Sequence, residues 1–120
     1  MDERGGLSFA ECGQLLDFTI KRAYWLYDIK DTRGGHAHKQ LKQLIFCAHG
    51  TVDFILDDAV SSEVIKLDSP NKGLIINQTI WREIKNFSQD AAVIVLASDI
   101  YDETDYIRSY EEFKKWKSPY

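Results

Sequence analysis

Residues 33–50, Arg-Gly-Gly-His-Ala-His-Lys-Gln-Leu-Lys-Gln-Leu-Ile-Phe-Cys-Ala-His-Gly, contain the pattern from which both the fold and the site can be predicted. The pair His36 and His38 precedes a run of apolar and β-branched residues that ends at Gly50. Because alternate side chains of a strand share one face, we expect both imidazoles on one face and Ala37 on the other. A single histidine on a strand is most often structural, whereas two on one face indicate a site.

The spacing around this pair resembles the two motifs of metal-binding cupin barrels. The first motif places a glutamate after His-x-His, and here that position holds Gln43. The second motif ends in His, three residues and Asn, which correspond here to Arg82 and Asn86. A divalent metal prefers imidazole and carboxylate ligands, and arginine cannot ligate one. We therefore expect a cupin-type site with no metal, in which the Arg82 guanidinium supplies positive charge.

The size and charge of the chain limit the classes of protein that it can be. Its 120 residues suit a single domain, residues 1–120, and its net charge of −4 argues against nucleic-acid binding. It has no run of about 18 apolar residues, which a membrane-spanning helix needs. The polar start does not resemble a secretory signal, and Cys12 and Cys47 make no disulfide framework. We expect a cytoplasmic protein with no membrane or nucleic-acid partner.

Short β-rich runs separated by turn residues predict a mostly β fold, a cupin-type antiparallel β-barrel (jelly roll). The predicted strands cover residues 18–27, 38–47, 51–56, 62–67, 74–77, 79–87 and 91–97. The last run is almost entirely apolar, which is typical of a strand buried on both faces.

A short amphipathic C-terminal helix is predicted over 105–116. Tyr106, Tyr110 and Phe113 recur there at helical spacing, and Asp102 or Thr104 can cap its start. We expect these aromatic residues to pack on the barrel as part of the core and not to form a ligand site.

Five blocks of sequence resemble the sugar-nucleotide 3,4-ketoisomerases of the WxcM-like cupin group. They are DERGGL (2–7), KRAY (21–24), RGGHAHK (33–39), LASD (96–99) and YDETDYIR (101–108). Together the blocks span almost the whole chain. The resemblance implies a β-barrel homodimer that acts on dTDP-4-dehydro-6-deoxy-D-glucose and moves its ketone from C4 to C3 without a metal or other cofactor.

The resemblance also implies roles for particular residues. His36 would be the catalytic base, with His38 beside it, and Tyr24 would be the partner acid or proton relay. Arg4 would line the sugar pocket, and Arg33 would contact the phosphates. Many members of the group have Trp-His-Glu where this chain has Trp81-Arg82-Glu83, so the configuration of the product at C4 stays open.

The predicted chemistry explains why these residue types suit the site. A ketone shift between adjacent carbons proceeds through an enediol, and a histidine near neutral pKa can move the proton. Arg82, Arg4 or the Tyr24 hydroxyl can stabilise the developing oxyanion, and the fork of Arg33 suits a diphosphate. Trp25 and Trp81 are both candidates to stack on the nucleobase.

Other interpretations remain open at this point. The same residues would serve a dTDP-sugar 3,5-epimerase, a sugar-nucleotide-binding cupin without catalysis, or a metal-dependent cupin oxygenase with an incomplete ligand set. Tyr24 can be a half-buried structural aromatic, and Arg82 can pair with Glu83 at the surface. Arg4 can be a solvated terminal charge. His49, which precedes a glycine, is expected to be only a turn residue.

Overall fold

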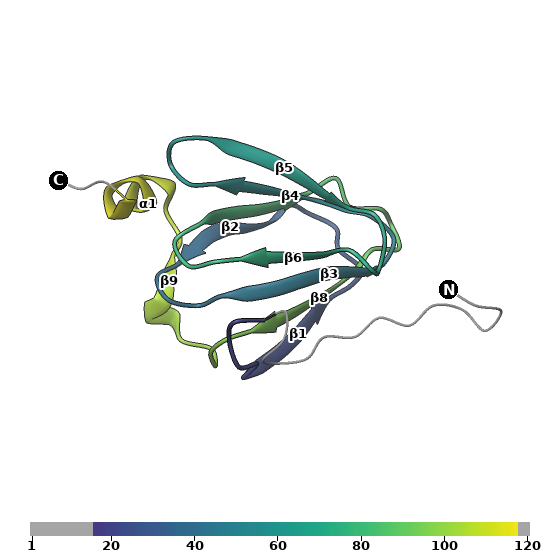
Figure 1. Cartoon of the computed structure of the whole chain (residues 1–120). Coiled ribbons are helices and arrows are strands. Elements are labelled where there is room, and N and C mark those ends of the chain that lie inside the picture. Colours follow the sequence, from purple (N-terminus) through teal and green to yellow (C-terminus); the bar gives the residue numbers. More distant parts are fainter. Residues whose placement is uncertain (1–15, 118–120) are drawn as a thin grey trace.

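The computed structural model describes residues 16–117, which form two antiparallel sheets that face each other and a short C-terminal helix (Figure 1). One sheet has the order β1 (Arg22–Leu26), β8 (Ala92–Ala97), β3 (Gln43–His49) and β6 (Gly73–Ile76). The other has the order β5 (Ser62–Leu67), β4 (Val52–Asp57), β7 (Trp81–Lys85), β2 (Arg33–His38) and β9 (Tyr106–Ile107). A 3₁₀ turn, η1 (Glu103–Asp105), leads into β9, and α1 (Tyr110–Lys117) follows it.

The predicted mostly β fold with one C-terminal helix is confirmed. Within residues 16–117 the strand ladders do not join the two sheets into a closed barrel, so the jelly roll is an open sandwich. The predicted strand over 38–47 is two strands, because β2 ends at His38 and β3 begins at Gln43 in the other sheet. The histidine pair and Gln43 therefore approach the site from opposite sheets.

The main core lies between the two sheets. Its largest members include Phe54, Leu67, Ile76 and Val93, each at most 1% exposed. In β8, Val93 and Val95 are buried while Ile94 and Leu96 are only half-buried. The prediction that this strand is buried on both faces is therefore wrong. Its outer side chains belong to an apolar face that the described chain leaves partly open.

A smaller apolar cluster covers the outer face of the five-stranded sheet. It consists of Ala37, Trp81, Ile107 and Phe113. Phe113 comes from α1, which lies against this end of the sheet (Figure 1). No helix within residues 16–117 is long and apolar enough to span a membrane.

The predicted helix over 105–116 begins too early. The observed helix starts at Tyr110, and Tyr106 lies in β9, where it pairs with His38. Pairing with the end of β2 therefore takes residues 106–107 into the sheet, although their spacing to Tyr110 and Phe113 is helical. As a result, the Tyr106 side chain faces the histidines and does not join the helix packing.

Candidate active site

The two histidines lie side by side at the end of β2. Their ring centroids are 4.8 Å apart and the rings are nearly perpendicular, at 86°. Ala37, between them, points into the opposite cluster, which confirms the alternation predicted from the sequence. The ladder between β2 and β7 is irregular just before His36. Gly34 lies there with φ of 98°, and a Cβ at this position would be only 3.0 Å from the backbone oxygen of Arg82.

His36 lines the pocket with one nitrogen free. Its Nδ1 contacts the carbonyl oxygen of Gly34. A carbonyl oxygen can only accept, so Nδ1 carries the proton and Nε2 keeps its lone pair. Burial, and then the nearby Arg82 cation, lower the pKa of His36 to about 4. The imidazole is therefore neutral at physiological pH and can accept a proton, although its pKa lies well below the near-neutral value that was expected from the sequence.

His38 lies behind this residue and is only 1% exposed. Its Nδ1 is 3.0 Å from Oδ2 of Asp105, and its ring packs against that of Tyr106 at 4.4 Å between centroids. Burial, followed by the charge of Arg82, lowers the pKa of His38 to about 2. Both imidazoles are thus neutral, although each has an acidic or polar partner.

Arg82 is buried on the same side of the sheet, opposite His36 in the β2–β7 ladder, with 2% of its surface exposed. Its Nη1 donates to Oε1 of Gln43, while Nε and Nη2 donate to the carbonyl oxygen of Ile80 at 3.2 and 3.0 Å. The proposed surface pair with Glu83 does not form. Burial lowers the pKa of Arg82 to about 10, which still leaves a cation at neutral pH.

Tyr24 completes a chain of hydrogen bonds that crosses from one sheet to the other. Nε2 of Gln43 donates to the Tyr24 hydroxyl at 3.0 Å, while Oε1 of Gln43 accepts from Arg82. The hydroxyl therefore accepts from Gln43 and can present its own proton to the pocket. Burial raises the pKa of Tyr24, so the side chain is a phenol and not a phenolate.

The pocket beside these groups has a volume of about 520 Å³. Its lining consists of Arg22, Tyr24, Leu26, Thr32, Arg33, Gly34, His36, Ile84, Tyr106 and Arg108. Arg33 is among these residues, while its contact with the phosphates stays a prediction. Arg4 lies outside the residues that the structure describes.

Two further arginines in the pocket differ in how their charge is balanced. Nε and Nη2 of Arg22 are buried with no hydrogen-bond partner among residues 16–117, and its guanidinium lies 5.1 Å from the Tyr24 ring centroid. Arg108 instead makes a two-bond ion pair with Glu103, at 2.6 and 2.8 Å. Arg22 therefore has unused donors for an anionic or hydroxyl-bearing ligand, whereas the charge of Arg108 is already matched.

Neither tryptophan proposed as a stacking partner lines the pocket. Trp81 belongs to the cluster under α1 and is 8% exposed. Trp25 is 63% exposed on β1 and points away from the side that Tyr24 occupies. His49 is exposed, lies near Asp90 and does not line the pocket, but it is the last residue of β3, so the expectation of a turn residue is wrong.

The donor set around Arg82 does not suit a divalent cation. Of the four positions that match cupin ligands, two hold neutral imidazoles, one holds Gln43 and one holds the guanidinium bonded to Gln43. A metal ion placed there would meet a positive charge and no carboxylate. Within residues 16–117 no three His, Cys, Asp or Glu side chains cluster as a metal site would require.

Sequence reasoning missed three residues of the site. Arg22 could have been found, because it alternates with Tyr24 on one strand and so shares its face. Asp105 and Tyr106 were assigned to the helix, so their approach to the histidines was not predicted.

Comparison with known proteins agrees with the motifs. The family model described as "FdtA: WxcM-like, C-terminal" matches residues 1–118. The chain belongs to this family. Membership in the FdtA family confirms the resemblance drawn from the sequence blocks.

Three relatives illustrate the similarity. A TDP-4-oxo-6-deoxy-alpha-D-glucose-3,4-oxoisomerase from Aneurinibacillus thermoaerophilus is 47% identical over 118 residues, which cover 97% of this chain and 85% of the relative. A 3,4-ketoisomerase from Helicobacter canadensis superposes with a TM-score of 0.93 at 43% identity, over 97% of this chain and 89% of that one. A mutant of the 3,4-ketoisomerase QdtA from Thermoanaerobacterium thermosaccharolyticum, in complex with TDP-4-keto-6-deoxyglucose, superposes with a TM-score of 0.94 at 36% identity. The match covers 98% of this chain and 86% of that one.

Proposed function

We propose that the protein is a 3,4-ketoisomerase that converts dTDP-4-dehydro-6-deoxy-D-glucose to the corresponding 3-dehydro sugar nucleotide. The observation that carries the proposal is a neutral His36, with its Nδ1 proton directed at Gly34, in the same pocket as Tyr24, whose hydroxyl accepts from Gln43 and can donate its own proton. Base and acid thus belong to the same pocket. Relatives at 47% and 43% identity are named as isomerases of this kind.

The reaction needs two proton movements and no oxidant. Nε2 of His36 removes the C3 proton, the electron pair forms the C3–C4 double bond, and O4 gains a proton to give an enediol. The O3 hydroxyl then loses its proton as the C3 ketone forms, and His36 returns a proton to C4. The net result exchanges the ketone and the hydroxyl between adjacent carbons, with atoms and electrons balanced.

The hydroxyl proton needs a carrier that can both accept and donate. Groups of this kind in or beside the pocket include the Tyr24 and Tyr106 hydroxyls, whose residues line it with His36, and Nε2 of His38, whose ring centroid is 4.8 Å from that of His36. The buried Arg82 cation favours the negative charge that develops at the enediolate, because its field acts in a poorly solvated site. The presence of Gln43 and Arg82 at two positions where cupins have metal ligands is therefore compatible with this chemistry.

The cations at the pocket fit the anionic part of the substrate. Arg22 has buried donors without partners among residues 16–117, and Arg33 lines the same pocket. We assign both to the diphosphate, where a planar guanidinium makes paired hydrogen bonds. Arg4 is proposed as a contact to the sugar on the family resemblance alone.

A homodimer is also proposed. The outer face of the four-stranded sheet exposes Trp25 at 63% and Ile75 at 45%, and the half-buried Phe46, Ile94 and Leu96 lie between them. A second copy would cover this apolar face. Sedimentation of the protein as a monomer at micromolar concentration would contradict the dimer.

The proposed activity is tested by proton NMR of the purified protein with dTDP-4-dehydro-6-deoxyglucose in heavy water. We expect a new 3-keto sugar with deuterium at C4, and its couplings will give the C4 configuration. Exchange at C3 and C5 with the ketone still at C4 would instead indicate an epimerase. Binding without exchange would indicate a non-catalytic cupin.

Two variants make this test specific to the site. His36→Asn should lose about 10³-fold in turnover, because a positioned base contributes on the order of 10²–10⁴-fold. His49→Asn, in an exposed histidine away from the pocket, should keep full activity. Equal activity of both variants would contradict the assignment of His36 as the base.

A further inference from the structure

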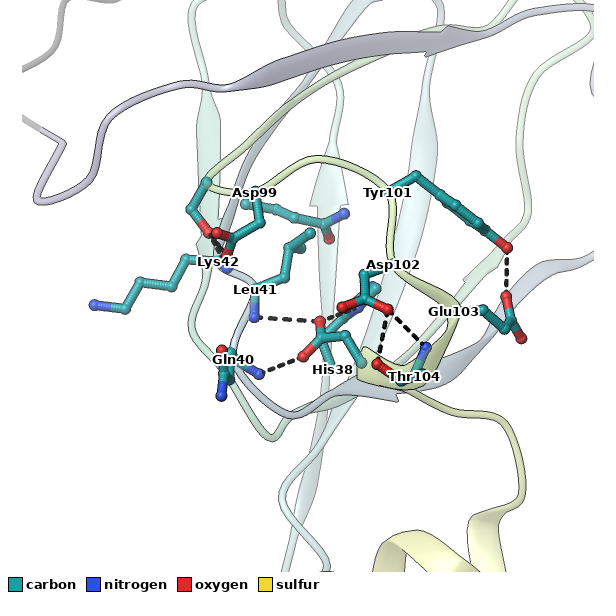
Figure 2. Close-up of polar contacts among 12 residues, drawn as sticks. His38, Gln40, Leu41, Lys42, Asp99, Tyr101, Asp102, Glu103 and Thr104 are labelled. Atoms are coloured by element: carbon teal, nitrogen blue, oxygen red, sulfur yellow. Dashed lines mark hydrogen bonds and ion pairs between the residues drawn. The ribbon is translucent and has the colours of Figure 1, made fainter.

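Besides its ladder with β9, the end of β2 is tied to the C-terminal segment by Asp105. Its Oδ1 accepts the backbone N–H of Gln40 at 2.8 Å, its Oδ2 lies 3.4 Å from the N–H nitrogen of Leu41, and its backbone carbonyl accepts the N–H of Lys39 at 3.0 Å. Figure 2 shows the N–H groups of Gln40 and Leu41 directed at the carboxylate beside His38. The position of this carboxylate is therefore set by the loop between β2 and β3, independently of His38.

The same carboxylate determines which nitrogen of His38 carries the proton. Oδ2 of Asp105 lies 3.0 Å from Nδ1 of His38. A carboxylate can only accept, and His38 is buried and neutral, so its single ring proton is on Nδ1. Nε2 is left as an acceptor, and it is buried with no partner within residues 16–117.

A buried acceptor that has no partner among residues 16–117 is costly unless a bound ligand or another group meets it. Leaving such a group unpaired costs on the order of 1–3 kcal/mol. The ring lies 4.8 Å from that of His36 and 4.4 Å from that of Tyr106, and both of these residues line the pocket. His38 is itself only 1% exposed, so the free nitrogen lies directly behind the side chains on which a substrate would rest.

We propose that Asp105 is a positioning residue that fixes His38 as the Nδ1–H tautomer, so that Nε2 stays an acceptor for proton transfer. The catalytic part of this inference rests on the proposed ketoisomerase activity. Asp105 itself touches no reacting atom and acts only through His38. The opposite tautomer would place a proton on Nε2, and a neutral imidazole of that kind could not take a hydroxyl proton from the substrate.

The test uses the nitrogen NMR signals of the histidines together with turnover. The chain has three histidines, so His36→Asn and His49→Asn assign the His38 signals by difference. We expect the wild-type protein to carry the His38 proton on Nδ1. In Asp105→Asn the amide can still accept from Gln40, but its NH₂ group faces His38, so we expect the proton to move to Nε2.

The kinetic readout separates tautomer control from a structural role. For Asp105→Asn we expect kcat to fall about 10²-fold, as for other residues that orient a ligand or base, with the Kd for dTDP unchanged. Asp105→Glu should restore the Nδ1–H tautomer and part of kcat. The matched control is Asp102→Asn, because the Asp102 carboxylate caps η1 through Thr104 (Figure 2), and no hydrogen bond within residues 16–117 joins it to His38.

The outcomes that overturn the inference are distinct from failure of the proposed activity. An Nε2–H tautomer in the wild-type protein overturns it, and this measurement stands even if Asp105→Asn fails to fold. A loss of kcat in Asp102→Asn equal to that in Asp105→Asn also overturns it, because both substitutions would then lower kcat by disturbing the conformation of η1. If the wild-type protein shows no turnover, the ketoisomerase proposal fails, while the tautomer of His38 is still measured.

Discussion

The two faces of the five-stranded sheet, at the meeting of β2, β7 and β9, use neighbouring residues for opposite purposes. The pocket side carries polar or aromatic side chains: His36, His38, Arg82 and Tyr106. The other side carries the apolar cluster under α1: Ala37, Trp81, Ile107 and Phe113. Each residue of the first set is adjacent in sequence to one of the second, because strand side chains alternate. Phe113, which comes from α1, is the member of the second set without such a neighbour.

One face of this sheet contributes stability, and the other carries the groups for the chemistry. On the pocket side, burial lowers the pKa values of His36 and Arg82, and the Nε2 of His38 has no partner among residues 16–117, so the burial of these polar groups opposes folding. On the helix side, Phe113 and Ile107 are at most 3% exposed and bury apolar surface. The helix thus supports a sheet whose other face is arranged for reaction.

The largest effect is expected from removing the aromatic anchor of the helix side. Phe113→Ala leaves a cavity between α1 and the sheet, and should lower the free energy of unfolding by about 3–5 kcal/mol. Chemical denaturation measures this loss. At low temperature, where the variant stays folded, kcat should change by no more than about twofold, which is under about 0.5 kcal/mol.

Trp116→Ala is the matched control on the same helix. This side chain is 51% exposed, so its loss should change stability by no more than about 0.5 kcal/mol. If folded Phe113→Ala lost turnover as severely as His36→Asn, the two faces of the sheet would not have separate roles in stability and catalysis.

A subtler change breaks the hydrogen-bond chain on the pocket side. In Gln43→Glu the side chain keeps its size, but a carboxylate cannot donate to Tyr24, so the hydroxyl proton would turn toward position 43. We expect kcat to fall about 10-fold or more, because the misdirected hydroxyl would lose part of the rate acceleration that a positioned acid supplies. Steady-state kinetics measures the fall.

A double variant that combines Gln43→Glu with Tyr24→Phe tests whether Gln43 acts through Tyr24. If Gln43 acts by orienting the Tyr24 hydroxyl, Gln43→Glu should slow the Tyr24→Phe enzyme little further, because residues in one network are not additive. Fully additive losses would mean that Gln43 acts through Arg82 or the fold and not through Tyr24.

The smallest effect is a dependence of stability on pH that comes from the pocket side alone. The pKa values of His36 and His38 are lowered from 6.5 to about 4 and about 2, so the unfolded chain binds protons that the folded protein does not. Stability should therefore fall as the pH drops below about 6.5. Between pH 6.5 and 5.5 the loss should be about 1 kcal/mol for each histidine.

Denaturation at the two pH values measures this loss. His36→Asn should reduce it by about half, whereas His49→Asn, at an exposed position, should leave it unchanged. A wild-type protein whose stability does not change over this range would contradict the neutral buried state of the pair.

The sequence predicted much of the site because strand alternation and motif spacing are local properties. The shared face of His36 and His38 follows from such a pattern. Tyr24 and Arg33, which line the pocket, were expected at the site only because their sequence blocks resemble those of the family. The start of the helix was predicted wrongly, since helical spacing from residue 106 onward competes with a strand pairing that only the folded chain provides.

By itself, the sequence determined the mostly β fold, the family and the residue types at the site, because each depends on residues near one another in the chain. Only the tertiary structure decided that Gln43 links Arg82 to Tyr24 across two sheets and that Asp105 reaches His38, 67 residues away in sequence. The same packing decided which ring nitrogens are free. Hydrogen-bond partners and desolvation depend on which distant segments pack together, and a local sequence pattern does not contain that information.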